Sequence, residues 1–300
     1  MGPGVTEVRA GRPPLSGHTR VVGVIGDPVT HSLSPTLHNA AFEALGLDWV
    51  YVAFPVPRGQ GASAVGGVAA LGLAGFNVTM PHKEAVAGAC DELTPDAAAL
   101  RSVNTVVAQA GGRTLGDSTD GPGFLDALDD EGITVAGQPV LVLGAGGAAR
   151  AVVLALGRAG ASVTVAARRP DAAESAAVLA PGARAVPLGA VAAPVPSSST
   201  VAVDPAAFAL VVNATPLGMS GGDPLPVDPE ALHGQQAVVD LVYHPADTPL
   251  LTAARARGAL AVNGLGMLLH QAARSFTLWT GQPAPLDAMR AAVTTALAAR

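Results

Sequence analysis

One lysine occurs in the whole chain, Lys83 in the segment FNVTMPHKE (76–84), although lysine and arginine together number 17. An ammonium group can lose its proton or act as a compact point charge, and arginine cannot replace it in either role. In a chain that otherwise uses arginine, Lys83 is therefore a candidate acid–base group. A leftover lysine on a solvated face is the alternative, and the neighbouring residues must decide between the two.

Further polar side chains stand where predicted strands end. Ligands of α/β proteins bind beyond the carboxyl ends of strands, so these side chains are expected to converge on one pocket with Lys83. Each also has a local explanation in a cap, a turn or a loop, and only their joint occurrence favours a site. The candidates are Ser32, Ser34, Asn77, Thr79, Asn104, Thr105 and residues 117–120 of GDSTDG, which include Asp120.

The segment VLVLGAGGAAR (140–150) has the spacing of a dinucleotide-binding loop. Gly144, Gly146 and Ala149 fit the pattern G-x-G-x-x-G/A directly between a predicted strand and a predicted helix. Gly144 permits the tight turn, Gly146 lets a pyrophosphate approach the backbone, and the helix N-terminus supplies N–H groups. A purely structural turn is the alternative, but the strand–loop–helix context favours a dinucleotide site.

The end of the next predicted strand indicates which dinucleotide is bound. An acidic residue there would bind the ribose 2′-hydroxyl of NAD. The chain instead has Arg168 and Arg169, whose guanidinium groups suit the 2′-phosphate of NADP. A solvated arginine pair remains the alternative, and Asp171 could still accommodate NAD.

Composition excludes several classes of protein. A net charge of −6 with no basic run gives no reason to expect nucleic acid or an anionic membrane as a partner. Cys90 is the only cysteine, so no intramolecular disulfide or CxxC metal site can form. Prolines interrupt the longest uncharged stretch, and the first 19 residues lack an apolar secretory core, so we expect a cytoplasmic protein without a membrane span.

Strand-like and helix-like segments alternate along the chain, which predicts α/β architecture with a parallel, doubly wound sheet in the second half. We expect strands at 21–26, 49–56, 76–80, 103–108, 113–116, 140–143, 162–167, 209–213, 237–243 and 260–263. We expect helices at 37–45 with Ser34 as the cap, at 60–71, 82–93 and 123–130, from 147 onward, and at 265–278 and 286–299. Residues 1–19 should be a flexible tail and residues 185–208 a variable loop.

Eight ordered segments between about Val21 and Gly281 resemble the shikimate dehydrogenase family. They are GDPVTHSLSPTLHN, FNVTMPHK, SVNTV, GDSTDG, LGAGGAAR, NATPLGM, DLVYHPADTPLL and NGLGMLLHQAA. The resemblance implies a substrate domain (20–125 and 266–300), a Rossmann-type NADP domain (126–265), and C-terminal helices that return to the substrate domain. It also implies NADPH-dependent reduction of 3-dehydroshikimate to shikimate, a step of aromatic amino-acid biosynthesis, by a monomer or homodimer.

Carried over by motif, the resemblance assigns roles to individual residues. Ser32, Ser34 and Tyr243 would bind the substrate carboxylate, and Asn77, Thr79, Lys83, Asn104, Asp120 and Gln271 would hold the ring hydroxyls. The cofactor residues would be Gly144, Ala145, Gly146, Gly147, Ala148, Arg168, Arg169, Thr215 and Gly264, and no metal is expected. Lys83 would be the acid–base group, or would stay charged and stabilise the alkoxide while the proton moves through Asp120 or water.

Two positions depart from the family pattern. Ser118 stands where the family commonly has asparagine, and Ala167-Arg168-Arg169 stands where it often has Asn-Arg-Thr, so one adenosine-side contact is missing. Relatives that act on quinate or aminoshikimate, with NAD, remain alternatives, although the Ser32 and Ser34 pair resembles the shikimate type. A non-catalytic NADP-binding sensor on the same fold is a third possibility, which the joint presence of Lys83 and Asp120 argues against.

Overall fold

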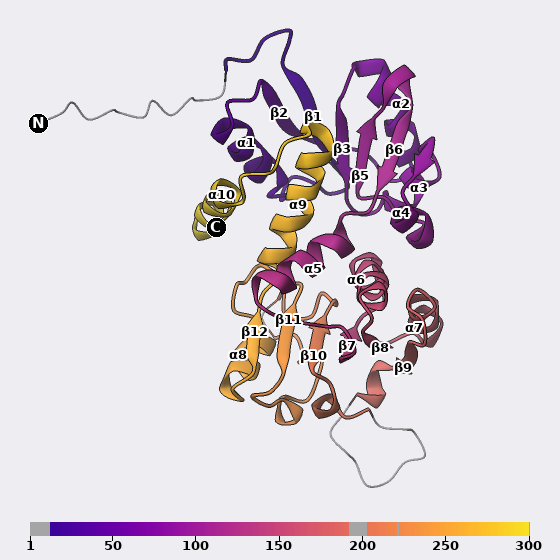
Figure 1. Cartoon of the computed structure of the whole chain (residues 1–300), viewed down its shortest axis with the longest axis vertical. Coiled ribbons are helices and arrows are strands. Elements are labelled where there is room, and N and C mark those ends of the chain that lie inside the picture. The colour runs from indigo at the N-terminus through magenta and orange to yellow at the C-terminus, as the bar shows by residue number, and fades with distance from the viewer. Residues whose placement is uncertain (1–12, 192–202, 221, 300) are drawn as a thin grey trace, which may run out of the picture. The chain divides into compact units, whose positions relative to one another are not determined.

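The computed structural model of the chain describes residues 13–191, 203–220 and 222–299 (Figure 1). Two compact units are present: an N-terminal unit made of Met1–Asp117 and Ala272–Arg300, and a central unit, Ser118–Gln271. The boundary near the C-terminus falls inside one helix, α9 (Leu265–Thr280). The functional domain limits predicted above stay a prediction. Residues 1–12 of the predicted tail and 192–202 of the predicted variable loop lie outside the described residues.

The N-terminal unit contains a six-stranded mixed sheet in the order β2-β1-β3-β5-β6-β4. Strands β2, β1 and β3 are parallel, β5 is antiparallel to both β3 and β6, and β4 is parallel to β6. The strands are β1 (Arg20–Gly26), β2 (Trp49–Pro55), β3 (Gly75–Val78), β4 (Glu92–Leu93), β5 (Thr105–Ala108) and β6 (Thr114–Asp117). The helices are α1 (Ser34–Ala44), α2 (Gly61–Leu71), α3 (Lys83–Ala87), α4 (Pro95–Leu100), the last part of α9, and α10 (Leu286–Ala298).

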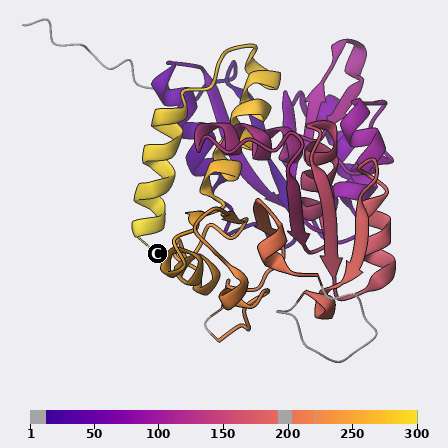
Figure 2. The same ribbon diagram turned by 60° about the horizontal axis from the view of Figure 1, so that its bottom comes forward.

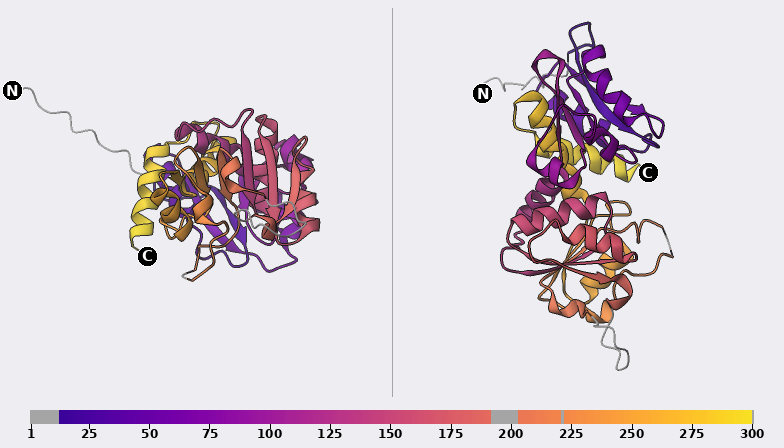
Figure 3. Two further views of the ribbon diagram at one scale, coloured as in Figure 1. Left: turned by 90° about the horizontal axis from the view of Figure 1, so that it is seen from below. Right: turned by 90° about the vertical axis from the view of Figure 1, so that its right-hand side faces the viewer.

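Helices cover this sheet on both faces, so the residues of its central strands β3 and β5 are largely buried. On one face, Phe76 and Val78 pack with residues of α2 and α3 in a common core. On the other face, Phe42 of α1 and Phe276 of α9 belong to an aromatic cluster that also includes Tyr51 of β2. Helix α10 packs against α1, as Figures 1 and 3 show, so the predicted return of the C-terminal helices to the N-terminal unit is confirmed.

The start of α1 differs from the prediction. Ser34 is the first residue of the helix, the preceding residue is Leu33, and no side chain caps the helix. The turn before the helix is closed instead by Ser32, whose hydroxyl accepts from the backbone N–H of Ser34 at 3.2 Å. The prediction of Ser34 as the cap was wrong, because Leu33 takes the cap position and Ser34 is already helical.

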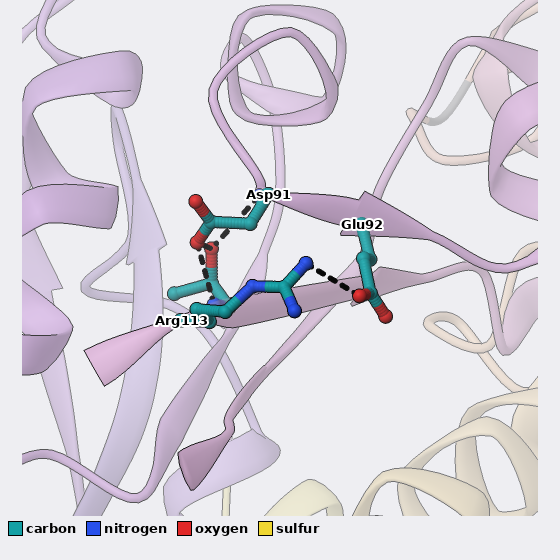
Figure 4. Close-up of polar contacts among 4 residues, drawn as sticks. Asp91, Glu92 and Arg113 are labelled. Carbon is teal, nitrogen blue, oxygen red and sulfur yellow. Dashed lines mark hydrogen bonds and ion pairs between the residues drawn. The ribbon is translucent and has the colours of Figure 1, made fainter. Parts of the chain in front are cut away.

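The helix predicted at 82–93 was also wrong beyond Ala87, where α3 ends. Glu92 and Leu93 form β4 instead, because they pair with Leu115 and Gly116 of β6. Figure 4 shows how this edge is held: Glu92 forms an ion pair with Arg113 at 2.5 Å, and Asp91 accepts hydrogen bonds close to Arg113. Strand pairing between segments distant in sequence therefore overrides the helical pattern.

The carboxylate of Asp91 accepts from the backbone N–H of Thr114 at 2.7 Å and from its hydroxyl at 2.9 Å. These bonds favour the ionised form and lower the pKa of Asp91. Helix α4, which the sequence analysis did not anticipate, follows directly, with the hydroxyl of Thr94 accepting from the N–H of Ala97 and Pro95 in its first turn.

The central unit contains a six-stranded, wholly parallel sheet in the order β12-β11-β10-β7-β8-β9. Counted within the unit, this is the order 6-5-4-1-2-3 of a Rossmann fold, which confirms the predicted doubly wound architecture. The strands are β7 (Pro139–Leu143), β8 (Ser162–Ala167), β9 (Arg184–Pro187), β10 (Leu210–Asn213), β11 (Ala237–Asp240) and β12 (Leu260–Val262). The helices are α5 (Asp120–Asp130), α6 (Gly147–Arg158), α7 (Pro170–Ala177), α8 (Pro249–Ala256) and the first part of α9.

Both faces of this sheet are buried, and alternate residues of one strand serve the two faces. Val140 and Val142 of β7 pack with α5 and α6, whereas Leu141 and Leu143 pack with α8. In Figure 2 the magenta to salmon strands of this sheet lie side by side. The continuous apolar run VLVL is thus explained by helices on both sides.

Two boundaries in the central unit differ from expectation. Strand β9 overlaps the start of the predicted variable loop at 185–208: it runs from Arg184 to Pro187 and pairs with β8 from Thr164 to Ala167. Helix α5 begins at Asp120, earlier than the predicted start at 123. The last two residues of GDSTDG are therefore helical, and this places the carboxylate of Asp120 in the first turn, where the helix dipole favours a negative charge.

Within the described ranges, no helix has the length and apolar character needed to cross a membrane. Across the same residues, no cluster of three or more histidine, cysteine, aspartate or glutamate side chains is arranged to hold a metal ion.

Candidate active site

The turn between β7 and α6 requires glycine at its first position. Gly144 has a φ of +112°, a conformation that residues with a side chain rarely adopt. A Cβ atom there would lie 2.8 Å from the carbonyl oxygen of Ala214, and the N–H of Gly144 donates to the carbonyl of Ala166 at 2.8 Å. Glycine at 144 thus lets the loop pass tightly between two neighbouring strands, as the sequence pattern predicted.

Packing within the protein does not require the two glycines at the start of α6, in contrast to Gly144. Gly146 precedes the helix without a side-chain cap, and a Cβ atom at Gly146 or Gly147 would meet nothing within 4 Å. Ala149, in contrast, lies on the face of α6 that is fully buried against the core of the unit. The exposed, uncapped N–H groups at the positive end of α6, beside the half-buried Ala145 and Ala148, suit a phosphate group.

Arg168 and Arg169 follow the end of β8, next to β7 in the sheet, and both are exposed. Among the described residues, neither forms an ion pair with an acidic side chain, so both guanidinium groups are available to an anionic ligand. Asp171, the residue that could serve NAD, lies in the first turn of α7. The cationic pair and the uncapped helix together fit a dinucleotide that carries an additional phosphate.

A buried polar network joins the ends of β10 and β11. The side-chain amide of Asn213 donates to Asp240 at 2.9 Å, and its oxygen accepts from the backbone N–H and the hydroxyl of Thr215 at 3.1 and 2.6 Å. Asp240 also accepts from the hydroxyl of Thr248 at 2.7 Å and from the backbone N–H of Val242 at 3.1 Å. Burial raises the pKa of Asp240, and these hydrogen bonds oppose that rise. The network fixes the loop that carries Thr215 and the loop that follows β11.

Tyr243 lies in that second loop, half-buried, directly after Val242. The loop is held against the chain that leads into α9, because the N–H of Gly264 donates to the carbonyl of Val242 at 3.1 Å. A Cβ atom at Gly264 would lie 2.1 Å from the carbonyl oxygen of Leu241, so only glycine permits this approach. Close packing alone accounts for glycine at 264, and its predicted contact with the cofactor stays a prediction.

The start of α5, which carries Asp120, packs against the backbone of Gln271 in α9. A Cβ atom at Gly123 would lie 2.5 Å from the backbone nitrogen of Gln271, and the hydroxyl of Thr119 donates to the carbonyl of Gln271 at 3.1 Å. On another side of α5, a Cβ atom at Gly121 would lie 2.7 Å from a backbone oxygen of α6. The glycines of DGPG therefore let α5 sit close to both helices, and this fixes the backbone on which both proposed substrate residues stand.

In the N-terminal unit, Asn77 is the centre of a second buried network. Its amide nitrogen lies 3.1 Å from the carbonyl of Asn104 and 3.0 Å from the hydroxyls of both Thr105 and Ser275. Its oxygen accepts from the phenol hydroxyl of Tyr51 at 2.7 Å. Two of the predicted substrate residues, Asn77 and Asn104, are thus joined directly, through the backbone carbonyl of Asn104 immediately before β5.

Lys83 and Thr79 flank the short turn between β3 and α3. The N–H of Thr79 donates to Ile25 of the neighbouring strand at 3.0 Å, and its methyl group occupies the space beside Gly26. Lys83 is half-buried, is the first residue of α3, and accepts from the N–H of Val103 through its backbone carbonyl at 3.1 Å. The turn therefore holds Lys83 beside the segment that carries Asn104 and leads into β5.

Four residues of these networks were missed by the sequence analysis as positioning groups: Tyr51, Ser275, Asp240 and Thr248. Tyr51 and Asp240 looked like ordinary strand residues, and Ser275 looked like part of a helix. Tyr51 carried one indication, since a tyrosine in an apolar strand brings a hydroxyl that usually finds a partner when buried. The partners themselves could not be read from the chain.

The strand order of the central unit and the open glycine-rich start of α6 define a Rossmann-type, dinucleotide-binding protein. Residues 24–106 match the shikimate dehydrogenase substrate binding domain, and residues 264–294 match the shikimate 5'-dehydrogenase C-terminal domain. The chain is 46% identical over 285 residues to shikimate dehydrogenase (NADP(+)) of Symbiobacterium thermophilum, and the match covers 94% of this chain and 96% of that relative.

Solved structures agree. A shikimate dehydrogenase in complex with NADP+ has a TM-score of 0.87 and 35% identity, covering 96% of this chain and 98% of its own. Shikimate 5-dehydrogenase of Thermus thermophilus, in complex with NADP(H) and shikimate, has a TM-score of 0.82 and 40% identity, covering 93% and 100%. The chain belongs to the shikimate dehydrogenase family, which confirms the predicted family, fold class and oxidoreductase character.

Proposed function

We propose that the protein is an NADP-dependent shikimate dehydrogenase that interconverts 3-dehydroshikimate and shikimate. The observation that carries the proposal is the start of α6. The helix N-terminus there is open and has no side-chain cap, and packing within the protein does not require glycine at 146 or 147. Arg168 and Arg169 support NADP over NAD, because they stand where an acidic residue would bind the ribose of NAD. The relatives' names, which specify NADP(+), agree with this choice.

NADP would supply hydride transfer to or from the substrate carbon, and the protein must handle the hydroxyl proton. We assign that task to Lys83 and Asp120. When the alcohol is oxidised, its hydroxyl proton must leave, and in the reverse direction a donor must meet the developing alkoxide. Lys83 either transfers the proton itself or remains charged and stabilises the alkoxide while Asp120 or water carries the proton.

Two lysine variants separate these roles. Lys83→Ala should lower kcat much more than it raises the KM for shikimate, because the ammonium acts mainly in the transition state. Lys83→Arg keeps the charge but cannot release a proton near neutral pH. A pH–rate profile left unchanged by Lys83→Arg would exclude Lys83 as the acid–base group and leave the electrostatic role.

The remaining side chains would bind the substrate. Ser32, Ser34 and Tyr243 are proposed for the carboxylate, and Asn77, Thr79, Asn104 and Gln271 for the ring hydroxyls. Ser32→Ala should chiefly raise the KM for shikimate, in contrast to the effect of Lys83→Ala. Equal effects of both variants on kcat and KM would contradict this division of roles. We also propose a cytoplasmic location and a monomeric or homodimeric state. Light scattering after size-exclusion chromatography would measure the molar mass and so test the oligomeric state.

The decisive experiment is a matrix of initial rates with shikimate, quinate and an amino analogue, each with NADP+ and NAD+. Rates dominated by shikimate with NADP+ would support the proposal and the role of the arginine pair. A preference for quinate or NAD+ would assign the protein to another branch of the family. Bound NADP+ without turnover of any substrate would indicate a non-catalytic sensor.

A further inference from the structure

A buried chain of hydrogen bonds runs through the N-terminal unit beside the proposed substrate residues. We call it the Tyr51 network, and it consists of Tyr51, Asn77, Asn104, Thr105 and Ser275. Two of its members, Asn77 and Asn104, are proposed substrate residues, whereas Tyr51, Thr105 and Ser275 have no proposed contact with the substrate. Tyr51 is 1% exposed and Thr105 and Ser275 are fully buried, so these three act only through their neighbours.

The network determines which way the amide of Asn77 points. The backbone carbonyl of Asn104 can only accept, and it lies 3.1 Å from one end of that amide, which must therefore be the nitrogen. The oxygen of Asn77 consequently faces Tyr51, 2.7 Å away, and can only accept. Tyr51 must be the donor in this bond. Without the phenol hydroxyl, the oxygen of Asn77 would lose the donor that holds it there.

The same logic extends to Asn104. The hydroxyl of Thr105 receives the amide of Asn77 at 3.0 Å and donates to the side-chain oxygen of Asn104 at 3.0 Å. Since the hydroxyl of Thr105 has a single proton, its 2.8 Å bond to Ser275 must be donated by Ser275. The side-chain oxygen of Asn104 therefore faces Thr105, and its nitrogen is directed elsewhere. The hydrogen bonds within the protein thus give each of the two asparagine side chains a defined orientation.

The surroundings of Tyr51 keep its hydroxyl in one place and in one protonation state. The ring of His38 stacks on it at 4.4 Å with an interplanar angle of 5°, and Trp279 lies 6.0 Å away between ring centroids. Burial raises the pKa of Tyr51 well above its usual value, so the hydroxyl stays protonated and remains a donor. Burial lowers the pKa of His38 to about 3, so the stacked ring is neutral.

We propose that Tyr51 is a positioning residue for the substrate: by donating to Asn77, its buried hydroxyl fixes the orientation of a side chain that is proposed to bind the ring hydroxyls. This inference rests on the proposed function, because Asn77 matters to turnover only if it binds shikimate. Ordering this side chain before the substrate arrives reduces the entropy lost on binding.

The test is Tyr51→Phe, which keeps the ring that packs against His38 and removes only the hydroxyl. The KM for shikimate should rise about tenfold, because a buried acceptor loses its partner and Asn77 is no longer held. The KM for NADP+ should stay within about twofold, since that site lies on the central unit. Thr114→Val is the matched control: it also removes a buried, hydrogen-bonded hydroxyl from the N-terminal sheet, but outside the Tyr51 network.

Thr114→Val should lower the melting temperature and leave both KM values unchanged. If Tyr51→Phe behaves in the same way, or raises both KM values in parallel, the hydroxyl is merely structural and the proposal is overturned. If the wild-type protein does not oxidise shikimate with NADP+, the proposed function fails and this inference fails with it, which is a different result from an active wild type with an unaffected variant.

A second variant covers the case in which Tyr51→Phe does not fold. Ser275→Ala removes a different partner of Asn77, contributed by α9. It should raise the KM for shikimate severalfold, with the KM for NADP+ unchanged. In the double variant Tyr51→Phe with Ser275→Ala, the effects on KM should be less than multiplicative, because both hydroxyls act through Asn77. Independent, multiplicative effects would contradict a shared route through Asn77.

Discussion

Substitution by alanine should have different effects at two glycines of the β7–α6 turn: it should lower stability at Gly144 and weaken cofactor binding at Gly146. In Gly144→Ala, a residue with a side chain is forced to φ near +112° and its Cβ lies 2.8 Å from the carbonyl oxygen of Ala214. Unfavourable backbone geometry costs about 1–3 kcal/mol and the close contact adds about as much, so we expect a loss of about 3 kcal/mol. At about 2–4 °C per kcal/mol, the melting temperature should fall by about 6–12 °C.

Gly146→Ala should leave stability almost unchanged. Gly146 has φ −76° and ψ −175°, which alanine adopts freely, and the new Cβ would meet nothing within 4 Å. The change in stability should lie within about 0.5 kcal/mol. If the open space is where a pyrophosphate approaches the backbone, the added methyl group should raise the KM for NADP+ about tenfold or more, equivalent to about 1.4 kcal/mol.

Thermal unfolding of both variants without ligand, followed by NADP+ titration of initial rates, measures the two effects separately. The reasoning is refuted if Gly146→Ala lowers the melting temperature as much as Gly144→Ala does, since the space beside Gly146 would then not be open. It is also refuted if Gly146→Ala binds NADP+ as well as the wild type, because the cofactor would then not approach α6 at that point.

Two further predictions concern carboxylates whose pKa values are shifted. Asp240→Asn should raise the KM for NADP+ severalfold and lower the melting temperature, because an amide nitrogen would replace an oxygen that accepts from Asn213 or Thr248. An unchanged KM would show that the loop carrying Thr215 does not depend on Asp240. Asp91 has a lowered pKa in the folded state, so its contribution to stability is complete above the ordinary value of 3.8 and is lost as the pH falls through the lowered value. Asp91→Ala should therefore be less stable than the wild type in urea unfolding at pH 7, and the difference should shrink near pH 2; a difference independent of pH would show that the charge of Asp91 is not involved.

Much of the fold could be predicted because the decisive patterns are local. The parallel strands of the central unit are short apolar runs between turn residues, and Gly144 and Gly146 stand between a strand and a helix. Where a segment's conformation depends on a distant partner, local patterns failed. Residues 92–93 have a helical pattern but form β4, because the free edge of β6 offers backbone hydrogen bonds. Strand β9 was missed because a short edge strand with a proline carries little pattern of its own.

The candidate site divides in the same way. The types and order of its residues, including the single lysine and the arginine pair after β8, are properties of the chain, because chemical identity and spacing need no tertiary contact to be recognised. The orientation of those residues is a property of the fold. Asn77 meets Ser275 across 198 positions of sequence, and Thr119 meets Gln271 across 152. Hydrogen bonds of this kind depend on the packing of whole helices and strands, so only the tertiary structure decided that Tyr51 and Ser275 hold Asn77 and that α5 holds Gln271.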